Sequence, residues 1–484
     1  MDQGRRKNLG VYYTPDHVLQ SLVHWVVRDA SDRMLDPSCG DGRFLAAHGP
    51  SLGVEMEGEA ASAARQRAPH AVVHQGDFFE WAARTEERFE CAAGNPPFIR
   101  YQRFAGDVRR RALEICACHG ARLSNLTSSW APFIVGAATL LKRGGRMAFV
   151  VPAEIGHAPY AHPVLRFLAS RFSRVQVVAI REKVFPGLSE DCWLLFCDGY
   201  GDRTPEFLLS AVDHFVFTPS PPSRKQSVRL EEWECWNFRL RPFLLPAGAR
   251  RFYQEAVHSG AAVRLGDLAN VGIGYVTGDN DFFHLRLSQA EQLRMPHRFL
   301  RPTVRNGKYL VGSAITPGAV RKWLQRDQPV LLLYLRPDEA LPPEVSRYLD
   351  SARGHAARKS FKCRTRSPWY CVPNVVEPEA FLSYMTNHAP ALVANYAGCT
   401  AANSVHLVRL MNGVSVRKLL AMWRHPLTQL SCEIEGHPLG GGMLKMEPGE
   451  AARVLLSPQP LLGRAEGRLI QDSVSTLRQW RHYG

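Results

Sequence analysis

The stretch DRMLDPSCGDGRFL, residues 32–45, decides how the first part of this chain folds. Residues 32–38 indicate a short buried strand, Asp36 stands at the end of that strand, and Gly40 and Gly42 form a tight turn into a helix. Glycines at such a turn let the backbone approach a ligand closely. The spacing differs from G-x-G-x-x-G, so it does not predict a dinucleotide-binding loop.

Further strand-like runs follow this stretch and alternate with helical ones. Between them lie alanine-rich or amphipathic segments, of which GEAASAARQRA is typical. Strands that alternate with helices predict a mostly parallel sheet with helices on both faces. The expected strands lie within residues 51–57, 71–79, 89–97, 174–185 and 191–199, and residues 131–152 indicate a helix, a Gly-Gly turn and a further strand. We therefore expect an α/β fold of the Rossmann-like kind.

The composition indicates the cellular compartment of this protein and the kind of molecule that it binds. The chain has 484 residues, a formal net charge of +15 and 11 cysteines without CxxC pairs or the spacing of a metal site. The cysteine pattern predicts reduced thiols in a cytoplasmic protein and no metal site. We expect neither a membrane span nor export, because no long apolar stretch and no signal-like core is present. The positive charge favours a polyanionic partner such as DNA or RNA.

The regular alternation of strand-like and helical runs ends after the first 215 residues. The stretch TPSPPSRKQS, residues 218–227, is polar and rich in proline and serine, which is typical of a linker. Beyond it the strand-like runs are short and basic clusters are common. The sequence predicts a catalytic domain over 1–215, a linker over 216–244 and a second, mixed α/β domain over 245–484.

Carboxylates stand at the ends of the first three predicted strands. Asp36 follows the first, Glu55 ends the second and Asp77 follows the third, with Phe78 beside it. Ligands of α/β sheets bind at this edge, where Glu55 can accept both hydroxyls of a ribose. Asp77 can accept from an adenine amino group, and Phe78 can offer a ring face. Because no phosphate-binding G-x-x-x-x-G-K-[ST] loop is present, the expected cofactor is S-adenosylmethionine.

The fourth predicted strand delivers Asn95, Pro96, Pro97 and Phe98 to the same edge. An exocyclic amine of a nucleobase is a poor nucleophile, because its lone pair is delocalised. If the Asn95 side-chain oxygen and the Pro96 carbonyl each accept one N–H of the amine, the lone pair turns toward the methyl donor. Two prolines fix the backbone direction. Phe98 can stack on the base, which must leave the duplex to arrive there.

These motifs, in this order, resemble the gamma class of amino-methylating DNA methyltransferases, of which the TaqI modification enzyme is the type. The resemblance covers residues 11 to about 196 and rests on GVYYTP (10–15), DPSCGDG (36–42), VEME (54–57), GDFF (76–79) and NPPF (95–98). It implies an S-adenosylmethionine-dependent methyltransferase domain followed by a target recognition domain. Its implied product is N6-methyladenine at a specific DNA site.

The resemblance also assigns residues to sites. It implies that Tyr13, Thr14 and Pro15 close over the methionine part of the cofactor, and that Asp36 and the glycine turn line it. It implies that Phe133 packs on the cofactor adenine and that Phe185 completes the sandwich around the flipped base. In the second domain, the basic cluster RKSFKCRTR is expected to hold DNA phosphates or to recognise a guanine edge. Its cations are Arg358, Lys359, Lys362, Arg364 and Arg366.

Several alternatives remain open on the residues alone. The same pair of acceptors fits cytosine N4, and related enzymes methylate RNA or a glutamine amide of a protein. A catalytically inactive DNA-binding specificity protein is a further alternative, against which the intact NPPF motif argues. Methylation at cytosine carbon 5 is not expected, because the chain has no Pro-Cys dipeptide. Nuclease and ATPase motifs are missing too. Cleavage in a restriction-modification system would therefore need a separate endonuclease, and the enzyme could equally be solitary. We expect it to act as a monomer on double-stranded DNA.

Overall fold

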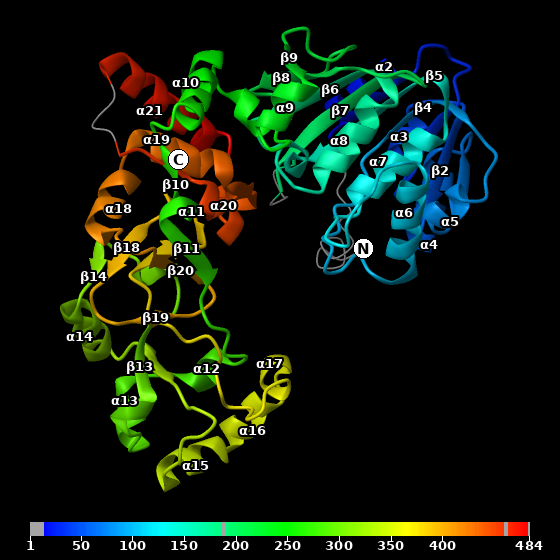
Figure 1. The fold of residues 1–484 in the computed structure, drawn as a ribbon. Helices are drawn as coiled ribbons and strands as arrows, with labels where there is room; N and C mark the ends of the chain where they lie inside the picture. Colours follow the sequence, from blue (N-terminus) through cyan, green and yellow to red (C-terminus); the bar gives the residue numbers. More distant parts are fainter. Residues whose placement is uncertain (1–13, 186–189, 459–462, 483–484) are drawn as a thin grey trace. The chain divides into compact units, whose positions relative to one another are not determined.

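The computed structural model describes residues 14–185, 190–458 and 463–482. The chain divides into two compact units, Met1–Leu245 and Pro246–Gly484 (Figure 1). Each unit is described below by itself.

A nine-stranded sheet forms the centre of the first unit. Its strands lie in the order β3-β2-β1-β4-β5-β7-β6-β8-β9, and the first five are parallel to one another. β7 lies antiparallel between β5 and β6. The strands are β1 (Met34–Asp36), β2 (Ser51–Glu55), β3 (Val72–Gln75), β4 (Phe89–Gly94), β5 (Leu141–Pro152), β6 (Phe172–Ile180), β7 (Cys192–Tyr200), β8 (Glu206–Val212) and β9 (Gln226–Arg229).

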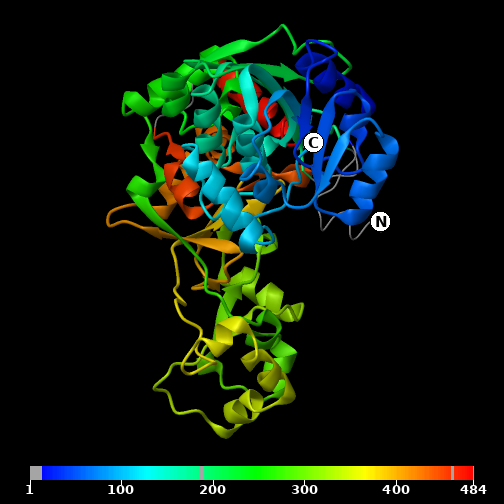
Figure 2. The same cartoon turned by 90° about the vertical axis from the view of Figure 1, so that its right-hand side faces the viewer.

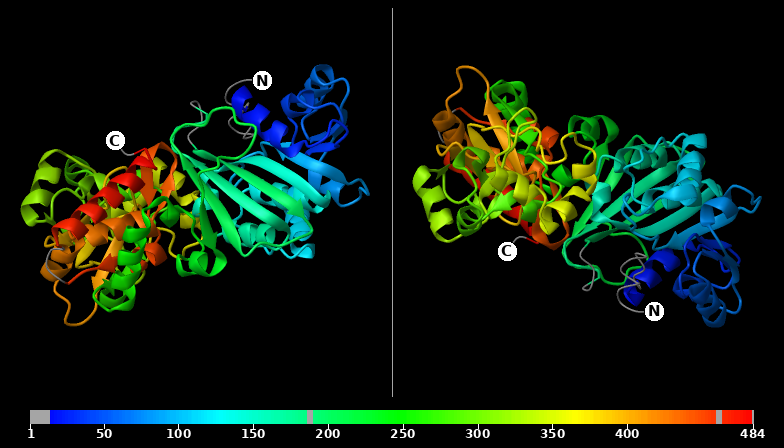
Figure 3. Two further views of the ribbon diagram at one scale, coloured as in Figure 1. Left: turned by 90° about the horizontal axis from the view of Figure 1, so that it is seen from above. Right: turned by 90° about the horizontal axis from the view of Figure 1, so that it is seen from below.

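Helices cover both faces of this sheet, which Figure 3 shows from above and below. Along β5, alternate side chains face opposite ways. Ala148 and Val150 pack with α2 in one apolar cluster, and α7 and α8 contact β5 and β6 respectively (Figure 1). The helices are α2 (Asp16–Val26), α3 (Arg43–Ala46), α4 (Gly58–Arg67), α5 (Phe78–Ala82), α6 (Gly106–Cys118), α7 (Trp130–Thr139), α8 (Ala161–Ala169) and α9 (Leu230–Cys235). This arrangement confirms the predicted α/β class.

The parallel pairing brings the ends of three strands to one edge. Asp36 pairs with Gly53 in β2, two residues before Glu55, and Leu35 pairs with Ala92 in β4. The carboxyl ends of β1, β2 and β4 therefore adjoin, and the residues that follow them share one surface.

The segment 216–244 differs from the predicted linker. β9 pairs antiparallel with β8 at the edge of the sheet, α9 follows it, and a 3-10 turn spans Arg241–Leu244. Trp233 of α9 is buried against Phe207 of β8, with ring centroids 5.0 Å apart. The proline- and serine-rich composition describes only the loop before β9. The described residues of this segment thus belong to the first unit.

The second unit contains four small sheets. The strand orders are β10-β23, β11-β20-β16-β18-β14, β12-β15-β13-β19 and β17-β22-β21. The strands are β10 (Val263–Arg264), β11 (Ala269–Ile273), β12 (His284–Leu285), β13 (Leu300–Val304), β14 (Ala314–Ile315), β15 (Leu331–Leu333), β16 (Ala380–Ser383), β17 (Met385–Thr386), β18 (Leu392–Asn395), β19 (Thr400–Ala401), β20 (Val405–Leu410), β21 (His437–Leu439), β22 (Met443–Lys445) and β23 (Leu455–Leu456).

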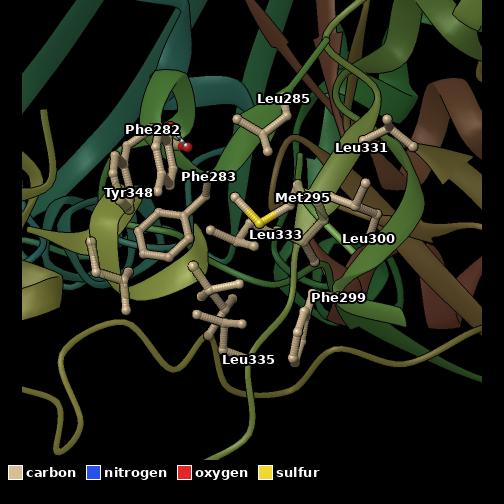
Figure 4. Packing of buried hydrophobic residues seen from close by; sticks show 14 of the residues in the cluster. Phe282, Phe283, Leu285, Met295, Phe299, Leu300, Leu331, Leu333, Leu335 and Tyr348 are labelled. Carbon is tan, nitrogen blue, oxygen red and sulfur yellow. Dashed lines mark hydrogen bonds between the residues drawn. The ribbon is translucent and has the colours of Figure 1, made fainter. Parts of the chain in front are cut away.

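The helices α15 to α17 lie together at one end of the second unit, as Figures 1 and 2 show. At that end Phe282 stacks on Tyr348, with ring centroids 4.7 Å apart, within an apolar cluster that Figure 4 shows. The helices are α10 (Ala247–His258), α11 (Leu265–Leu268), α12 (Asn280–Phe283), α13 (Leu287–Gln292), α14 (Pro317–Gln325), α15 (Pro343–Leu349), α16 (Ala352–Arg358), α17 (Phe361–Arg364), α18 (Val416–Trp423), α19 (Pro426–Glu435), α20 (Pro448–Arg453) and α21 (Arg464–Gln479).

Candidate functional site

A cavity of about 290 Å³ lies at the carboxyl edge of β1, β2 and β4. Its size is at the lower end of the range for small-molecule sites. The cavity brings together residues that are far apart in the sequence, and most of the predicted cofactor residues are among them. The predicted residues that line it are Thr14, Asp36, Gly40, Glu55, Phe78, Asn95, Pro97 and Phe133.

Asp36 is the last residue of β1 and is only 1 % exposed. Its Oδ1 accepts a hydrogen bond of 3.1 Å from the backbone N–H of Ser38. Burial is the main cause that raises the pKa of the Asp36 carboxyl from 3.8 to about 8, and the nearby Glu55 carboxylate adds to it. Without a ligand the carboxyl therefore keeps its proton near neutral pH, and a cation placed in the cavity would favour the charged form.

Glu55 ends β2 and connects the second strand to the glycine turn. Its Oε2 accepts from the backbone N–H of Gly40 at 2.9 Å, and its Oε1 accepts from that of Glu57 at 2.8 Å. Burial raises the pKa of Glu55. Each oxygen retains a further acceptor position, so this carboxylate can accept two hydroxyl groups from a ligand.

The two glycines of the turn have different roles. Gly40 has φ +54° and lines the cavity, whereas Gly42 has φ +82° and does not line it. A Cβ on Gly42 would lie 2.8 Å from the Cα of Ala64 in α4. Gly42 thus allows α3 and α4 to pack closely, and only Gly40 presents its backbone to the cavity.

Asp77 does not line the cavity, although its neighbours Gly76 and Phe78 do. Its carboxylate accepts from the backbone N–H of Phe79 at 3.0 Å and so caps the start of α5. It also forms an ion pair with Arg111 of α6, with 3.2 Å between Oδ2 and Nε. The structure thus directs the Asp77 carboxylate toward a helix start and an arginine, and the predicted hydrogen bond to adenine has no counterpart in the cavity wall.

Two aromatic rings form one wall of the cavity. Phe78 of α5 and Phe133 of α7 stack on each other, with ring centroids 5.4 Å apart and planes 19° apart. A ring in this cavity would therefore contact a wall made of both side chains. It would not be inserted between them.

The NPPF segment leaves β4 and passes along the cavity. Asn95 and Pro97 line it, Pro96 is buried beside it, and Phe98 turns toward the apolar cluster around α2. Phe185 belongs to that same cluster and is 6 % exposed. The structure therefore places the two predicted base-stacking rings in one cluster.

The N-terminal residues of the predicted site are described in part. Thr14 lines the cavity and is 3 % exposed. Pro15 precedes α2, and its carbonyl accepts from the backbone N–H groups of Val18 and Leu19. Pro15 thus begins the helix and is not part of the wall. Tyr13 lies outside the described residues.

The segment that follows the NPPF motif contributes a wall that sequence reasoning missed. Phe104 is buried in that wall and precedes α6, and Val108 lies in the first turn of that helix. The chain is extended at Ala105 between them, so no helical periodicity links the two residues in the sequence. The other lining residues outside the predictions are Pro37, Ser38, Cys39, Asp41, Arg43, Phe44, Val54, Met56, Glu57, Gly76, Ile99, Arg103, Ala105 and Ser129.

The basic cluster of the second unit lies on α16, α17 and the residues beside them. Four of its five predicted cations are exposed: Arg358, Lys359, Lys362 and Arg364. Arg366 turns inward instead, and its guanidinium donates to the carbonyls of Thr277 and Val276. Arg366 therefore holds a loop of its own unit.

No group of three or more potential metal ligands occurs within the part of the chain that the structure describes. Among the same residues, no helix is long and apolar enough to cross a membrane.

The chain is similar to two curated Type II methyltransferases over nearly its whole length. It is 24 % identical to Type II methyltransferase M.XamI of Xanthomonas campestris pv. amaranthicola, over 93 % of this chain and 85 % of the relative. It is 20 % identical to Type II methyltransferase M.AccI of Acinetobacter calcoaceticus, over 99 % of this chain and 89 % of the relative.

A solved structure shares the fold. The cryo-EM structure of a DrdV–DNA complex aligns with a TM-score of 0.52 and 11 % identity, and covers 98 % of this chain. This chain spans 57 % of the length of that protein. The predicted fold class, a methyltransferase-like α/β domain followed by a mixed α/β domain, is confirmed. The family model of the C-terminal domain of Type II methyltransferase M.Eco57I matches residues 239–481, half of the chain, and the chain belongs to this family of Type II methyltransferases.

Proposed function

We propose that this chain is a site-specific DNA methyltransferase that transfers a methyl group from S-adenosylmethionine to the N6 amine of a flipped adenine. The observation that carries the proposal is that Asn95 and Pro97 line the same cavity as Asp36 and Glu55. An amine acceptor motif and a nucleoside-sized cavity thus adjoin at one sheet edge. The family membership of the chain supports the same reaction class.

The residues around the cavity fit S-adenosylmethionine. Glu55 would accept the ribose hydroxyls, and the wall of Phe78 and Phe133 would contact the adenine ring. The Ser38 hydroxyl lines the cavity and is buried, with no hydrogen-bond partner among the described residues. Such a group requires a partner, and a polar ligand supplies one. When bound, the cofactor supplies an electrophilic methyl group.

The chain's own residues would activate the amine. The side-chain oxygen of Asn95 and the carbonyl of Pro96 would each accept one N–H of the base. Since both acceptors are fixed before the base arrives, little reorganisation is needed at the moment of transfer. The proline rings restrict the backbone on both sides of the acceptor carbonyl. Phe98 and Phe185, which belong to one cluster, would contact the ring of the base.

We assign DNA binding and sequence recognition to the second unit. The four exposed cations of α16, α17 and their neighbours, together with the net charge of +15, suit phosphate contacts. Catalysis is assigned to residues 1–215 and target recognition to residues 245–484. The protein would act as a monomer on DNA, beside a separate endonuclease or as a solitary enzyme.

The decisive experiment is transfer of labelled methyl groups to unmethylated duplex DNA, followed by digestion and identification of the modified nucleoside. N6-methyladenine is the expected product. N4-methylcytosine would retain the pair of acceptors and refute the assignment of the base. Absence of label in DNA of any sequence would refute the proposal and direct the search to RNA and protein substrates.

A further inference from the structure

Ser129 holds the NPPF segment by three hydrogen bonds. Its hydroxyl accepts from the backbone N–H of Ile99 at 2.9 Å and donates to the carbonyl of Pro97. Its own backbone N–H donates to the carbonyl of Ile99 at 2.9 Å. Ser129 is fully buried and lines the cavity, so no bulk water competes for these bonds.

The use of this hydroxyl is unusual for a serine at its position. Ser129 directly precedes α7, where a serine side chain commonly caps the first free N–H groups of the helix. Here the side chain forms no capping bond. Its donor and acceptor are both directed to residues 97 and 99, which lie some thirty positions earlier in the chain.

These bonds fix the direction of the carbonyl that matters for the proposed reaction. The ring of Pro97 limits its φ angle, and the bond from Ser129 to the Pro97 carbonyl fixes its ψ angle. The planar peptide between Pro96 and Pro97 must then point in one direction, and the Pro96 carbonyl lies in that plane. The bonds to Ile99 fix the other flank of Phe98.

Ser129 also connects the motif to the cofactor wall. Phe133 stands four residues later on α7, one turn along the same helix face, and lines the cavity. Loss of the Ser129 hydroxyl would release the Pro97 carbonyl from the start of α7, whereas Phe133 would keep its place within the helix.

We infer that Ser129 is a positioning residue for methyl transfer, which aims the Pro96 carbonyl at the target amine. The inference rests on the proposed function. It predicts that loss of the hydroxyl slows the transfer step and leaves cofactor binding nearly unchanged, because none of the three bonds involves the carboxylates that would hold the cofactor.

The test compares Ser129→Ala, Ser129→Thr and Ser129→Cys with Thr127→Val. The Thr127 hydroxyl is buried two residues earlier and has no hydrogen-bond partner among the described residues, so it is a matched control. Single-turnover methylation of duplex DNA gives the rate constant, and calorimetry with S-adenosylmethionine gives the affinity and the fraction of active protein. Hydrogen exchange at the Ile99 amide follows the bond itself.

Ser129→Ala should slow transfer by roughly 10- to 100-fold per active molecule, the scale of a small misplacement of reacting groups. Cofactor affinity should change by less than about threefold, and Ile99 should exchange faster. Ser129→Thr should restore most of the rate, Ser129→Cys should be intermediate, and Thr127→Val should match the wild type.

Three results would overturn the inference. Transfer by Ser129→Ala at the wild-type rate would show that the hydroxyl does not position the acceptor. A loss of rate that merely follows the loss of cofactor binding would indicate a structural role alone. Absence of transfer by the wild-type chain on any DNA would instead overturn the proposed function, and the inference with it, while exchange at Ile99 would still report whether the bond exists.

Discussion

Replacement of Asp36 by asparagine should change how the stability of the first unit depends on pH. The Asp36 carboxyl has a pKa of about 8 in the folded chain and an ordinary value of 3.8. Between these values the folded state retains a proton that the unfolded chain has released. The contribution of Asp36 to stability is therefore largest at low pH and falls as the pH rises toward 8, by about 1.4 kcal/mol per pH unit. Above that pKa the carboxyl is ionised in both the folded and the unfolded chain, and the loss of stability from burying its charge no longer grows with pH.

Asparagine has nearly the same shape, and its oxygen can still accept from the N–H of Ser38, but it carries no titrating proton. The free energy of unfolding of the variant, minus that of the wild type, should therefore grow with pH. Over the three units between about pH 5 and about pH 8, the slope gives a change of about 4 kcal/mol. Titrating groups that do not interact with Asp36 are common to both proteins and cancel in this difference, whereas the interaction with Glu55 remains in it.

Urea unfolding of both proteins without cofactor, followed by tryptophan fluorescence at several pH values, measures the effect. The second unit supplies an internal reference, because Asp36 lies in the first unit and the transition of the second should not move. A difference between variant and wild type that stays constant from about pH 5 to about pH 8 would refute the reasoning, since Asp36 would then be ionised in the folded chain throughout.

Three further predictions concern other parts of the molecule. Asn95→Ala should lower the rate of methyl transfer, measured in single-turnover assays, by at least about 100-fold. The affinity for S-adenosylmethionine, measured by calorimetry, should stay within about threefold of wild type. A variant with full activity would contradict the role of Asn95 as an acceptor. Replacement of Lys359 and Lys362 by glutamine should reduce the slope of log affinity for DNA against log salt concentration by about 0.9 per lost phosphate contact. The same replacement at the exposed Arg417 and Lys418 of α18 should leave this slope unaltered. Gly42→Ala should destabilise the first unit more than Gly40→Ala in thermal unfolding, because both have positive φ but only the Gly42 Cβ would meet Ala64; equal losses would contradict the packing role.

The ends of β1 and β2 can be predicted from the sequence, because each depends on a few neighbouring residues: an apolar run, a carboxylate and a turn. A short apolar run that ends in Asp36 and a glycine turn has few alternative folds, and Glu55 follows from the next run by the same argument. The parallel register of β1 and β2 then places the two carboxylates near each other, with Asp36 buried and Glu55 partly buried.

Asp77 shows what local reasoning cannot decide. The sequence GDFF indicates a strand end with a carboxylate facing a ligand. The same aspartate is also a strong helix N-cap, and its partner Arg111 lies in α6, beyond the whole of β4. No local pattern decides between these roles, because the second partner is supplied by tertiary packing.

Ser129 and the 216–244 segment were missed for a related reason. A serine before a helix predicts a cap, and only the fold brings the NPPF segment within reach of its hydroxyl. The proline-rich loop indicates a linker, yet the four residues of β9 suffice to add an antiparallel strand to β8. Both outcomes depend on contacts between distant segments.

The second unit is closed by its own first and last elements. Val263 of β10 pairs with Leu456 of β23, and α10 contacts α21. On the ribosome, this unit cannot form its contacts with α21 until that helix has left the exit tunnel, whereas the strands described for the first unit end at Arg229. Domains that emerge first generally fold first. A growing chain would therefore complete the sheet edge that carries Asp36 and Glu55 before the unit that carries the basic cluster of α16 and α17 is folded.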